Sequence, residues 1–341
     1  MVIGVIIYIY IIDMKSLNEY LLEGGLFNNI GAGDWEVDEG KIREWLAKAR
    51  IYVKDPDDLL IKGRDSHPIV NSRVLVSPGV NVAINVVSKP ELFPDGRWPE
   101  FMRFSWIERG VTVIDCGLVT LEGMPPVYDY LNVSANKLTT LEGYQHNEIF
   151  NIGTNVPALN ASHNDLQSLK GCPKCSDLKV NHNQHLRSLR GMKSGRMLNS
   201  LSAENCDLRD LAGCPKLQKH TSLLSLCNNP NLDIENGLGK ILSITEDIYS
   251  LAIDASHVKG FTNAYQNSIG SAYICNVDDS EFLRSDDFIN FIKTFSKRHN
   301  KLYVRISGFV SYNDIRETDL WANKEGFNVN IQQSTAFAGE K

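Results

Sequence analysis

Four residues near the middle of the chain have the types and the spacing of zinc ligands. Cys172 and Cys175 form a Cys-x-x-Cys pair, and His182 and His185 follow within ten residues of it. Thiolates and imidazoles are the ligands that build most tetrahedral zinc sites. Whether these four side chains can meet depends on the structural elements that carry them.

A phrase of six residues recurs in the sequence around these candidates. Its first and third residues are apolar and its sixth is most often Asn, as in Leu131–Asn136 and Leu178–Asn183. Seven copies begin at residues 111, 131, 159, 178, 201, 224 and 251, so that successive copies are 19 to 28 residues apart. The alternation of apolar and polar residues predicts a short strand in each copy.

The residues that follow each phrase repeat as well. Leu138, Leu141 and Gly143 stand two, five and seven residues after Asn136, and the same offsets recur in three other copies. A unit of about 20–29 residues with this leucine pattern is a leucine-rich repeat. One coil cannot bury its apolar side alone, so the coils must stack. The sequence therefore predicts an α/β fold, a leucine-rich-repeat solenoid of about seven irregular coils.

The repeat argues against a zinc site. Cys172 and His182 occupy the places that Cys214 and His163 hold in other coils, so their types have a structural explanation. The other two candidate ligands are expected on opposite sides of a strand. We therefore predict no metal ion and no cofactor.

The sequence gives equally little support for a catalytic site. A cysteine nucleophile needs a histidine base and a third group that orients it. Cys227 is the only cysteine expected on the exposed side of the strands, and no histidine stands at the same depth in the adjacent coils. The sequence also has no glycine-rich phosphate loop before a helix and no recognisable pair of catalytic carboxylates. We predict no catalytic residues and no enzymatic activity.

The second and fourth residues of each phrase are expected on the concave face of the sheet, whereas the sixth should lie inside and bond to neighbouring backbone groups. The exposed set is short, polar and mostly uncharged, which suits either a solvated surface or a docking surface for a protein partner. With a net charge of -6 for the chain, we expect no nucleic-acid binding. The predicted protein-binding residues are Asn132, Ser134, Asn160, Ser162, Lys179, Asn181, Ser202, Glu204, Ser225 and Asp254.

Further elements flank the repeats, which span residues 111–262. Residues 31–110 are predicted to form an N-terminal cap with a helix at Asp38–Ile51 and strands at Asp58–Ile61 and Val74–Val87. Residues 263–332 are predicted to form a C-terminal α/β cap that continues the repeat sheet, with a separate small domain as the alternative. Residues 333–341 are expected to be a loose tail. The elements of the C-terminal cap are a strand at Ala272–Val277, a helix from Ser285, a strand at Leu302–Ile306, a helix at Asp314–Lys324 and a strand at Phe327–Ile331.

The cysteines indicate a reducing compartment. There are seven, an odd number, and most of them stand at repeat positions. This suits buried thiols better than a disulfide framework.

The first 30 residues divide into two parts. Residues 1–13 are an apolar extension, too short to span a membrane, which either precedes the native start or forms a strand-prone appendage. Residues 14–30 begin with an amphipathic segment, Met14–Glu23, followed by two glycines. This segment resembles the capsid-targeting peptides of internal head proteins in large contractile-tailed phages. The resemblance implies cleavage by a prohead protease between Glu23 and Gly24. The alternative is an ordinary N-terminal helix that ends at the glycines.

The phrase Leu-x-x-Leu-x-Gly-Cys/Met-Pro also resembles leucine-rich-repeat proteins of the same phages. Together the two resemblances imply a non-enzymatic protein-interaction module that is packaged in the phage head and later delivered into the host cytoplasm. The prohead protease and the capsid scaffold would then be further partners. One alternative is a cytoplasmic phage or bacterial interaction protein that is not packaged. Another is an effector enzyme whose activity lies in the C-terminal unit and whose repeats select the substrate.

Overall fold

The computed structural model describes residues 39–51, 83–102, 107, 110–127, 129–144, 156–192, 196–296 and 301–334. The chain divides into two compact units, and the described residues from Lys41 onward belong to the larger one, formed by residues 41–62 and 76–341. The predicted strand at Asp58–Ile61, the apolar extension at residues 1–13 and the peptide around Glu23 and Gly24 lie outside the described residues.

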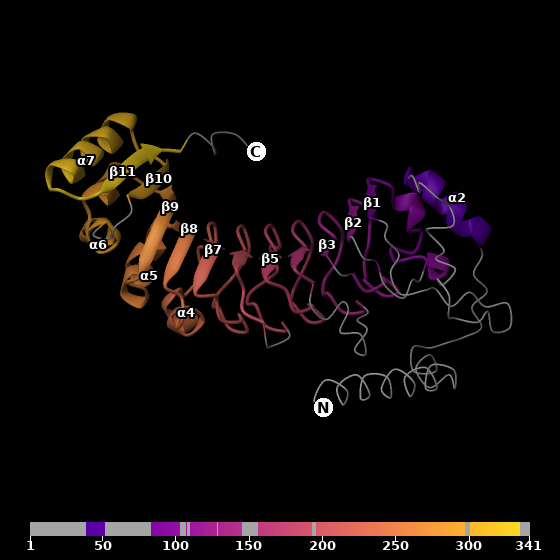
Figure 1. Cartoon of the computed structure of the whole chain (residues 1–341). Coiled ribbons are helices and arrows are strands. Elements are labelled where there is room, and N and C mark those ends of the chain that lie inside the picture. The colour runs from indigo at the N-terminus through magenta and orange to yellow at the C-terminus, as the bar shows by residue number, and fades with distance from the viewer. Residues whose placement is uncertain are drawn as a thin grey trace, which may run out of the picture. The chain divides into compact units, whose positions relative to one another are not determined.

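The larger unit contains one open sheet of eleven parallel strands, arranged in the order of the sequence (Figure 1). The architecture is α/β and compatible with a solenoid, because each turn of the chain adds one strand beside the previous one. The strands are β1 (Ile84–Val87), β2 (Val111–Ile114), β3 (Tyr130–Asn132), β4 (Ala158–Asn160), β5 (Asp177–Lys179), β6 (Ser200–Ser202), β7 (His220–Ser225), β8 (Asp247–Asp254), β9 (Ser268–Val277), β10 (Leu302–Gly308) and β11 (Val329–Gln333).

One column of buried side chains runs through all eleven strands. The first residue of each predicted phrase pairs with the first residue of the next, from Val111 through Leu131 to Leu251. The same register continues to Ile84 on one side, and to Ala272, Val304 and Ile331 on the other. Every member of this column is at most 4% exposed, so the inward orientation of the first residue is confirmed. The C-terminal strands continue the repeat sheet, as the sequence predicted.

The asparagine at the sixth position lies inside, as expected, and satisfies backbone groups of two adjacent repeats. In Asn136, Oδ1 accepts from the backbone N–H groups of Cys116 and Leu118, and Nδ2 donates to the carbonyl oxygens of Val113 and Val133. Asn164, Asn183 and Asn229 make equivalent bonds. These strands are only a few residues long, so the side-chain amide replaces hydrogen bonds that a longer ladder would supply. The expectation is wrong only at Ser256, which is exposed because the chain there enters a 3-10 helix, Ala255–His257.

The fifth position of the phrase has a backbone role that the sequence did not indicate. It adopts a left-handed conformation in eight repeats, with φ between 52° and 58°. In the repeats with a buried sixth residue, this turn lies near the C-terminal end of the strand and precedes the residue that points back into the core. Side chains other than Gly adopt it at some cost, since it brings Cβ close to the backbone. The residues are Ser88, Asp115, Ala135, His163, His182, Asn205, Asn228 and Asn276.

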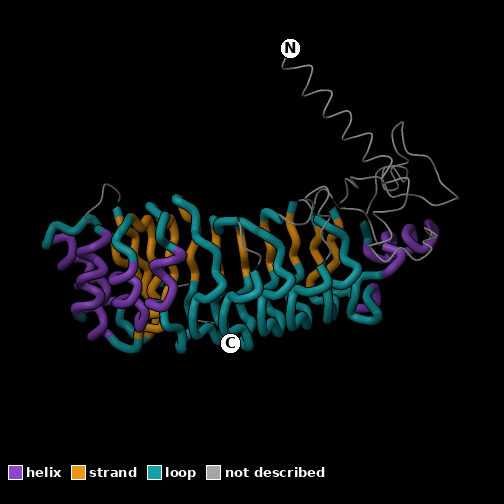
Figure 2. The backbone as a smooth tube through the Cα atoms, turned by 90° about the horizontal axis from the view of Figure 1, so that it is seen from below, coloured by secondary structure: helices purple, strands orange, loops and turns teal. Residues whose placement is uncertain are grey.

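Helices occur at the two ends of the row of strands (Figure 2). The N-terminal one, α2 (Glu39–Ala49), confirms the predicted helix and buries Trp45 against Phe93 and Trp98. At the C-terminal end, α6 and α7 match the predicted helices, whereas the two short helices α4 and α5 were not predicted. Their bounds are α4 (Glu235–Ile241), α5 (Val258–Ala264), α6 (Asp286–Phe295) and α7 (Tyr312–Lys324).

Capping explains why α6 begins where it does. The Ser285 hydroxyl accepts from the backbone N–H of Phe288, and Asp286 and Asp287 lie in the first turn, where the helix dipole favours acidic residues. Four apolar side chains, Phe288, Phe291, Ile292 and Phe295, are buried on one face. Among the described helices, none has the length and apolarity needed to cross a membrane.

Candidate functional site

The face of the sheet that carries the second and fourth residues is the candidate site, and we call it the open face. Asn132, Asn160 and Asn181 are half-buried there, and Lys179 is exposed. The amide oxygen of Asn132 accepts from the backbone N–H and the hydroxyl of Ser134. These residues therefore present partly satisfied polar groups on a fixed backbone, which suits recognition at low entropic cost.

Five predicted binding residues are corrected by the structure. Ser134, Ser162, Ser202, Ser225 and Asp254 were expected to be exposed but are between 1% and 8% exposed. Their side chains are short, so larger neighbours cover them and use their polar atoms. The Ser202 hydroxyl donates to the amide oxygen of Asn181, and the Ser225 hydroxyl donates to the carboxylate of Glu204. These five side chains therefore lie beneath the outer surface of the open face and do not form part of it.

The C-terminal part of the open face contains a hollow that the sequence interpretation missed. It has a volume of about 250 Å³ and lies across β8 to β11. Exposed Tyr303 and Arg305 line it together with half-buried Tyr273, whose hydroxyl lies 2.6 Å from the Ser307 hydroxyl. The sequence predicts these strands as part of a cap, so the predicted binding face excludes their outward residues. Tyr273 and Arg305 pair with each other and follow Ala272 and Val304, as the second residue of each phrase follows the first. Extending the phrase to these strands would have placed both residues on the predicted face.

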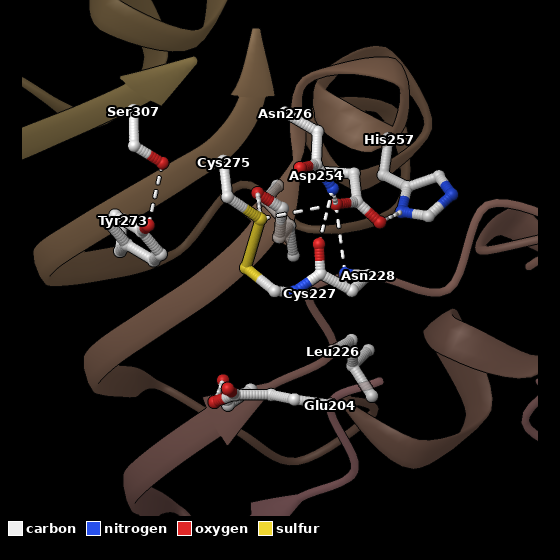
Figure 3. Close-up of a disulfide and its surroundings, with 12 residues drawn as sticks. Glu204, Leu226, Cys227, Asn228, Asp254, His257, Tyr273, Cys275, Asn276 and Ser307 are labelled. Carbon is white, nitrogen blue, oxygen red and sulfur yellow. Dashed lines mark hydrogen bonds and ion pairs between the residues drawn. A yellow bond between two sulfur atoms is a disulfide. The ribbon is translucent and has the colours of Figure 1, made fainter. Parts of the chain in front are cut away.

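A second cluster lies around a disulfide in the repeats that contain β7, β8 and β9 (Figure 3). Cys227, Asp254 and Cys275 stand at the fourth position of three successive repeats and are 2%, 3% and 4% exposed. The two cysteines form a disulfide, with 6.5 Å between their Cα atoms. Two expectations are therefore wrong: the cysteines are not all free thiols, and Cys227 is not the only one on this face. The other described cysteines are free.

Asp254 is held firmly in the middle of this cluster. Its Oδ2 accepts from the backbone N–H of Asn229 at 3.1 Å, and its Oδ1 accepts from the backbone N–H of Asn228 and the side chain of Asn276. The sulfur of Cys275 lies 3.1 Å from the same Oδ1. These contacts fix the orientation of the buried carboxylate.

His257 approaches the carboxylate from the other side. Its Nδ1 lies 3.6 Å from Oδ2 of Asp254, too far for a hydrogen bond, and has no other partner. Burial lowers the pKa of His257 below its usual range, although the nearby Asp254 carboxylate and the backbone of Leu232 act in the opposite direction. A buried polar nitrogen without a partner costs about 1–3 kcal/mol. Nδ1 of His257 is therefore a buried atom without a hydrogen bond, beside a carboxylate whose two oxygens are both hydrogen-bonded.

The residues that first suggested zinc do not form one site. Cys172 and Cys175 are buried, and the Cys172 thiol lies 3.3 Å from the carbonyl oxygen of Pro173. The neighbouring Cys175 thiol and burial raise the pKa of Cys172 well above its usual range. His182 and His185 are exposed, and the ring of His182 stacks on that of His163 at 4.1 Å. Within the described ranges, the group with three ligand atoms within 4.8 Å of one another is instead Cys227, Asp254 and Cys275.

Comparisons with known proteins identify no relative. No family model matches the chain, and no curated protein and no solved structure matches it.

Proposed function

We propose that this protein is a leucine-rich-repeat module that binds a protein partner on the open face of its sheet and has no enzymatic activity of its own. The observation that carries the proposal is the open face itself. All-parallel sheets are almost always covered on both faces. Here the second residues of β2 to β5 and of β9 to β11 remain at least partly accessible, so a large regular surface is left for a partner.

The chemistry of this surface favours a protein over a nucleic acid. The charged residues at its described second and fourth positions are few and of both signs, Lys179 and Arg305 against Glu204 and Asp254. Nucleic-acid binding depends on neutralising many phosphates and needs a basic surface. Interfaces between proteins are enriched in tyrosine and arginine. Tyr303 is 52% exposed and Arg305 is also exposed, so both side chains are available for such contacts at the hollow.

A charge-reversal series tests the proposed face. Lys179→Glu with Arg305→Glu places two acids on the open face, and we expect the Kd of the natural partner to rise about tenfold or more. The partner is the protein that co-purifies with the tagged chain from producing cells, purified and titrated by calorimetry. Lys216→Glu with Lys240→Glu is the matched control, because it changes the net charge equally at exposed sites off this face. Equal weakening by both pairs would show a general charge effect and contradict the proposal.

The proposed location is the phage head, followed by the host cytoplasm. Support comes from the resemblance of Met14–Glu23 to capsid-targeting peptides and of the repeats to phage proteins. We expect mass spectrometry of purified particles to detect this chain with Gly24 as its first residue. Detection in infected cells but not in particles would favour the cytoplasmic alternative. A peptide spanning Glu23 and Gly24 in particles would contradict the cleavage.

A further inference from the structure

We propose that Cys227, Asp254 and Cys275 form a binding site for a zinc-like divalent cation when the two cysteines are reduced. The ligand atoms of the three side chains lie within 4.8 Å of one another. Zinc bonds of about 2.3 Å to sulfur and about 2.0–2.2 Å to carboxylate oxygen place neighbouring ligand atoms somewhat more than 3 Å apart. The three residues can therefore reach one ion through small side-chain rotations.

The repeat architecture holds these ligands in place. They occupy the same position in three successive repeats, at or just beyond the C-terminal ends of the paired segments, which run from His220 to Ser225 in β7 and from Asp247 to Asp254 in β8. Asp254 pairs directly with Cys275 in the sheet. Metal sites are tightest when the backbone that carries the ligands is already ordered. This condition is met before any ion arrives.

His257 is placed where it could orient the carboxylate of Asp254 when an ion binds. Its buried Nδ1 faces Oδ2 of Asp254 at 3.6 Å without a hydrogen bond. Carboxylates that bind metals are commonly oriented by a hydrogen bond to their second oxygen. Oδ2 of Asp254 already accepts from the backbone N–H of Asn229, and a small shift of the His257 ring toward it would add a second hydrogen bond, which would hold the carboxylate while Oδ1, 3.1 Å from the sulfur of Cys275, binds the cation. We therefore assign His257 as the positioning residue of the site.

The disulfide and the metal-bound form exclude each other. Two molecules of a low-molecular-weight thiol together supply the two electrons and two protons that reduce the protein disulfide, and they leave joined to each other as a disulfide. This step gives two thiols. The divalent cation then replaces both thiol protons, which leave to solvent, and binds the two thiolates and the carboxylate. The ligand set contains two soft sulfur donors, which favour zinc over magnesium or calcium.

Metal binding by the full-length chain tests the site. We expect the reduced wild type to bind one Zn²⁺ per chain in equilibrium dialysis, and the oxidised wild type to bind none at the same position. Co²⁺ in place of zinc should give thiolate-to-cobalt charge-transfer absorption. Cys227→Ser with Cys275→Ser should abolish both signals. Serine suits the fold there, since Ser134 and Ser162 occupy the equivalent position in other repeats.

Two further variants separate this site from the alternatives. Cys172→Ser with Cys175→Ser removes the other close pair of thiols and should leave zinc binding unchanged. His257→Gln should weaken zinc binding about 10- to 100-fold without abolishing the cobalt absorption, as expected for a positioning residue. X-ray absorption at the zinc edge of the reduced wild type should show two sulfur ligands. The proposal is overturned if the reduced wild type binds no zinc, if binding survives without Cys227 and Cys275, or if it is lost without Cys172 and Cys175.

Discussion

Replacing Asn136 by Ala is expected to lower the free energy of unfolding by about 4 kcal/mol. The amide of this residue bonds to the backbone of Cys116, Leu118, Val113 and Val133. Alanine would remove this partner from the buried N–H groups of Cys116 and Leu118 and from the carbonyl of Val113, whereas the carbonyl of Val133 also accepts from Asn164. Each unsatisfied buried group costs about 1–3 kcal/mol, partly recovered by relaxation. Urea unfolding followed by circular dichroism measures the change.

Asn132→Ala is the matched control for this effect. It removes the same side chain four residues earlier in the same repeat, where the amide is half-buried and accepts only from Ser134. We expect a loss below about 1 kcal/mol. Similar losses for both variants would mean that the sixth-position amide has no special role, and the account of how the repeats are held together would fail.

Gly171→Ala is expected to destabilise the chain by about 3–5 kcal/mol. The residue has φ +85, and an added Cβ would lie 2.4 Å from the carbonyl carbon and oxygen of Leu141 in the preceding repeat. The left-handed conformation costs a side chain about 1–2 kcal/mol. The contact adds more, because the obstructing atoms belong to backbone that can move only if the repeats separate.

Gly326→Ala isolates the conformational part of this cost. Its φ is +82, nearly the same, but no atom lies within 4 Å of the added Cβ. We therefore expect a loss of only about 1–2 kcal/mol, measured in the same urea titration. If Gly171→Ala cost no more than Gly326→Ala, close backbone stacking between repeats would not be what selects glycine at this position.

The sequence predicted the elements whose signal is local and repeated. Leu131, Leu159 and Leu178 mark an inward column because their spacing recurs, and Asn136 marks a buried amide because a polar residue recurs in an apolar column. Both are confirmed by burial and hydrogen bonds. The C-terminal strands were also found, since Leu302–Ile306 alternates in the manner of a strand.

What the sequence did not reveal depends on residues from distant parts of the chain. Cys227 and Cys275 are 48 residues apart, and the copy that contains Cys275 begins with Ala272 and ends with Val277, so it was not recognised as a repeat. The hollow at Tyr303 was not predicted either, because the strands that line it were likewise not recognised as repeats. Ser202 and Ser225 were oriented correctly but their burial was not foreseen, because periodicity gives the direction of a side chain and not the size of its neighbours. The left-handed residue His163 carries no glycine or asparagine signal.

The central claim, that the open face binds a protein, is tested most directly by site-specific photocrosslinking in producing cells. A photoreactive amino acid is placed singly at Lys179 or Arg305 on the open face, and at Lys216 or Lys240 elsewhere. All four side chains are exposed, so the substitutions are comparable in their effect on folding. The account predicts that both open-face positions crosslink to the same protein and that the other two do not. Crosslinks to that protein from Lys216 or Lys240, with none from Lys179 and Arg305, would contradict it.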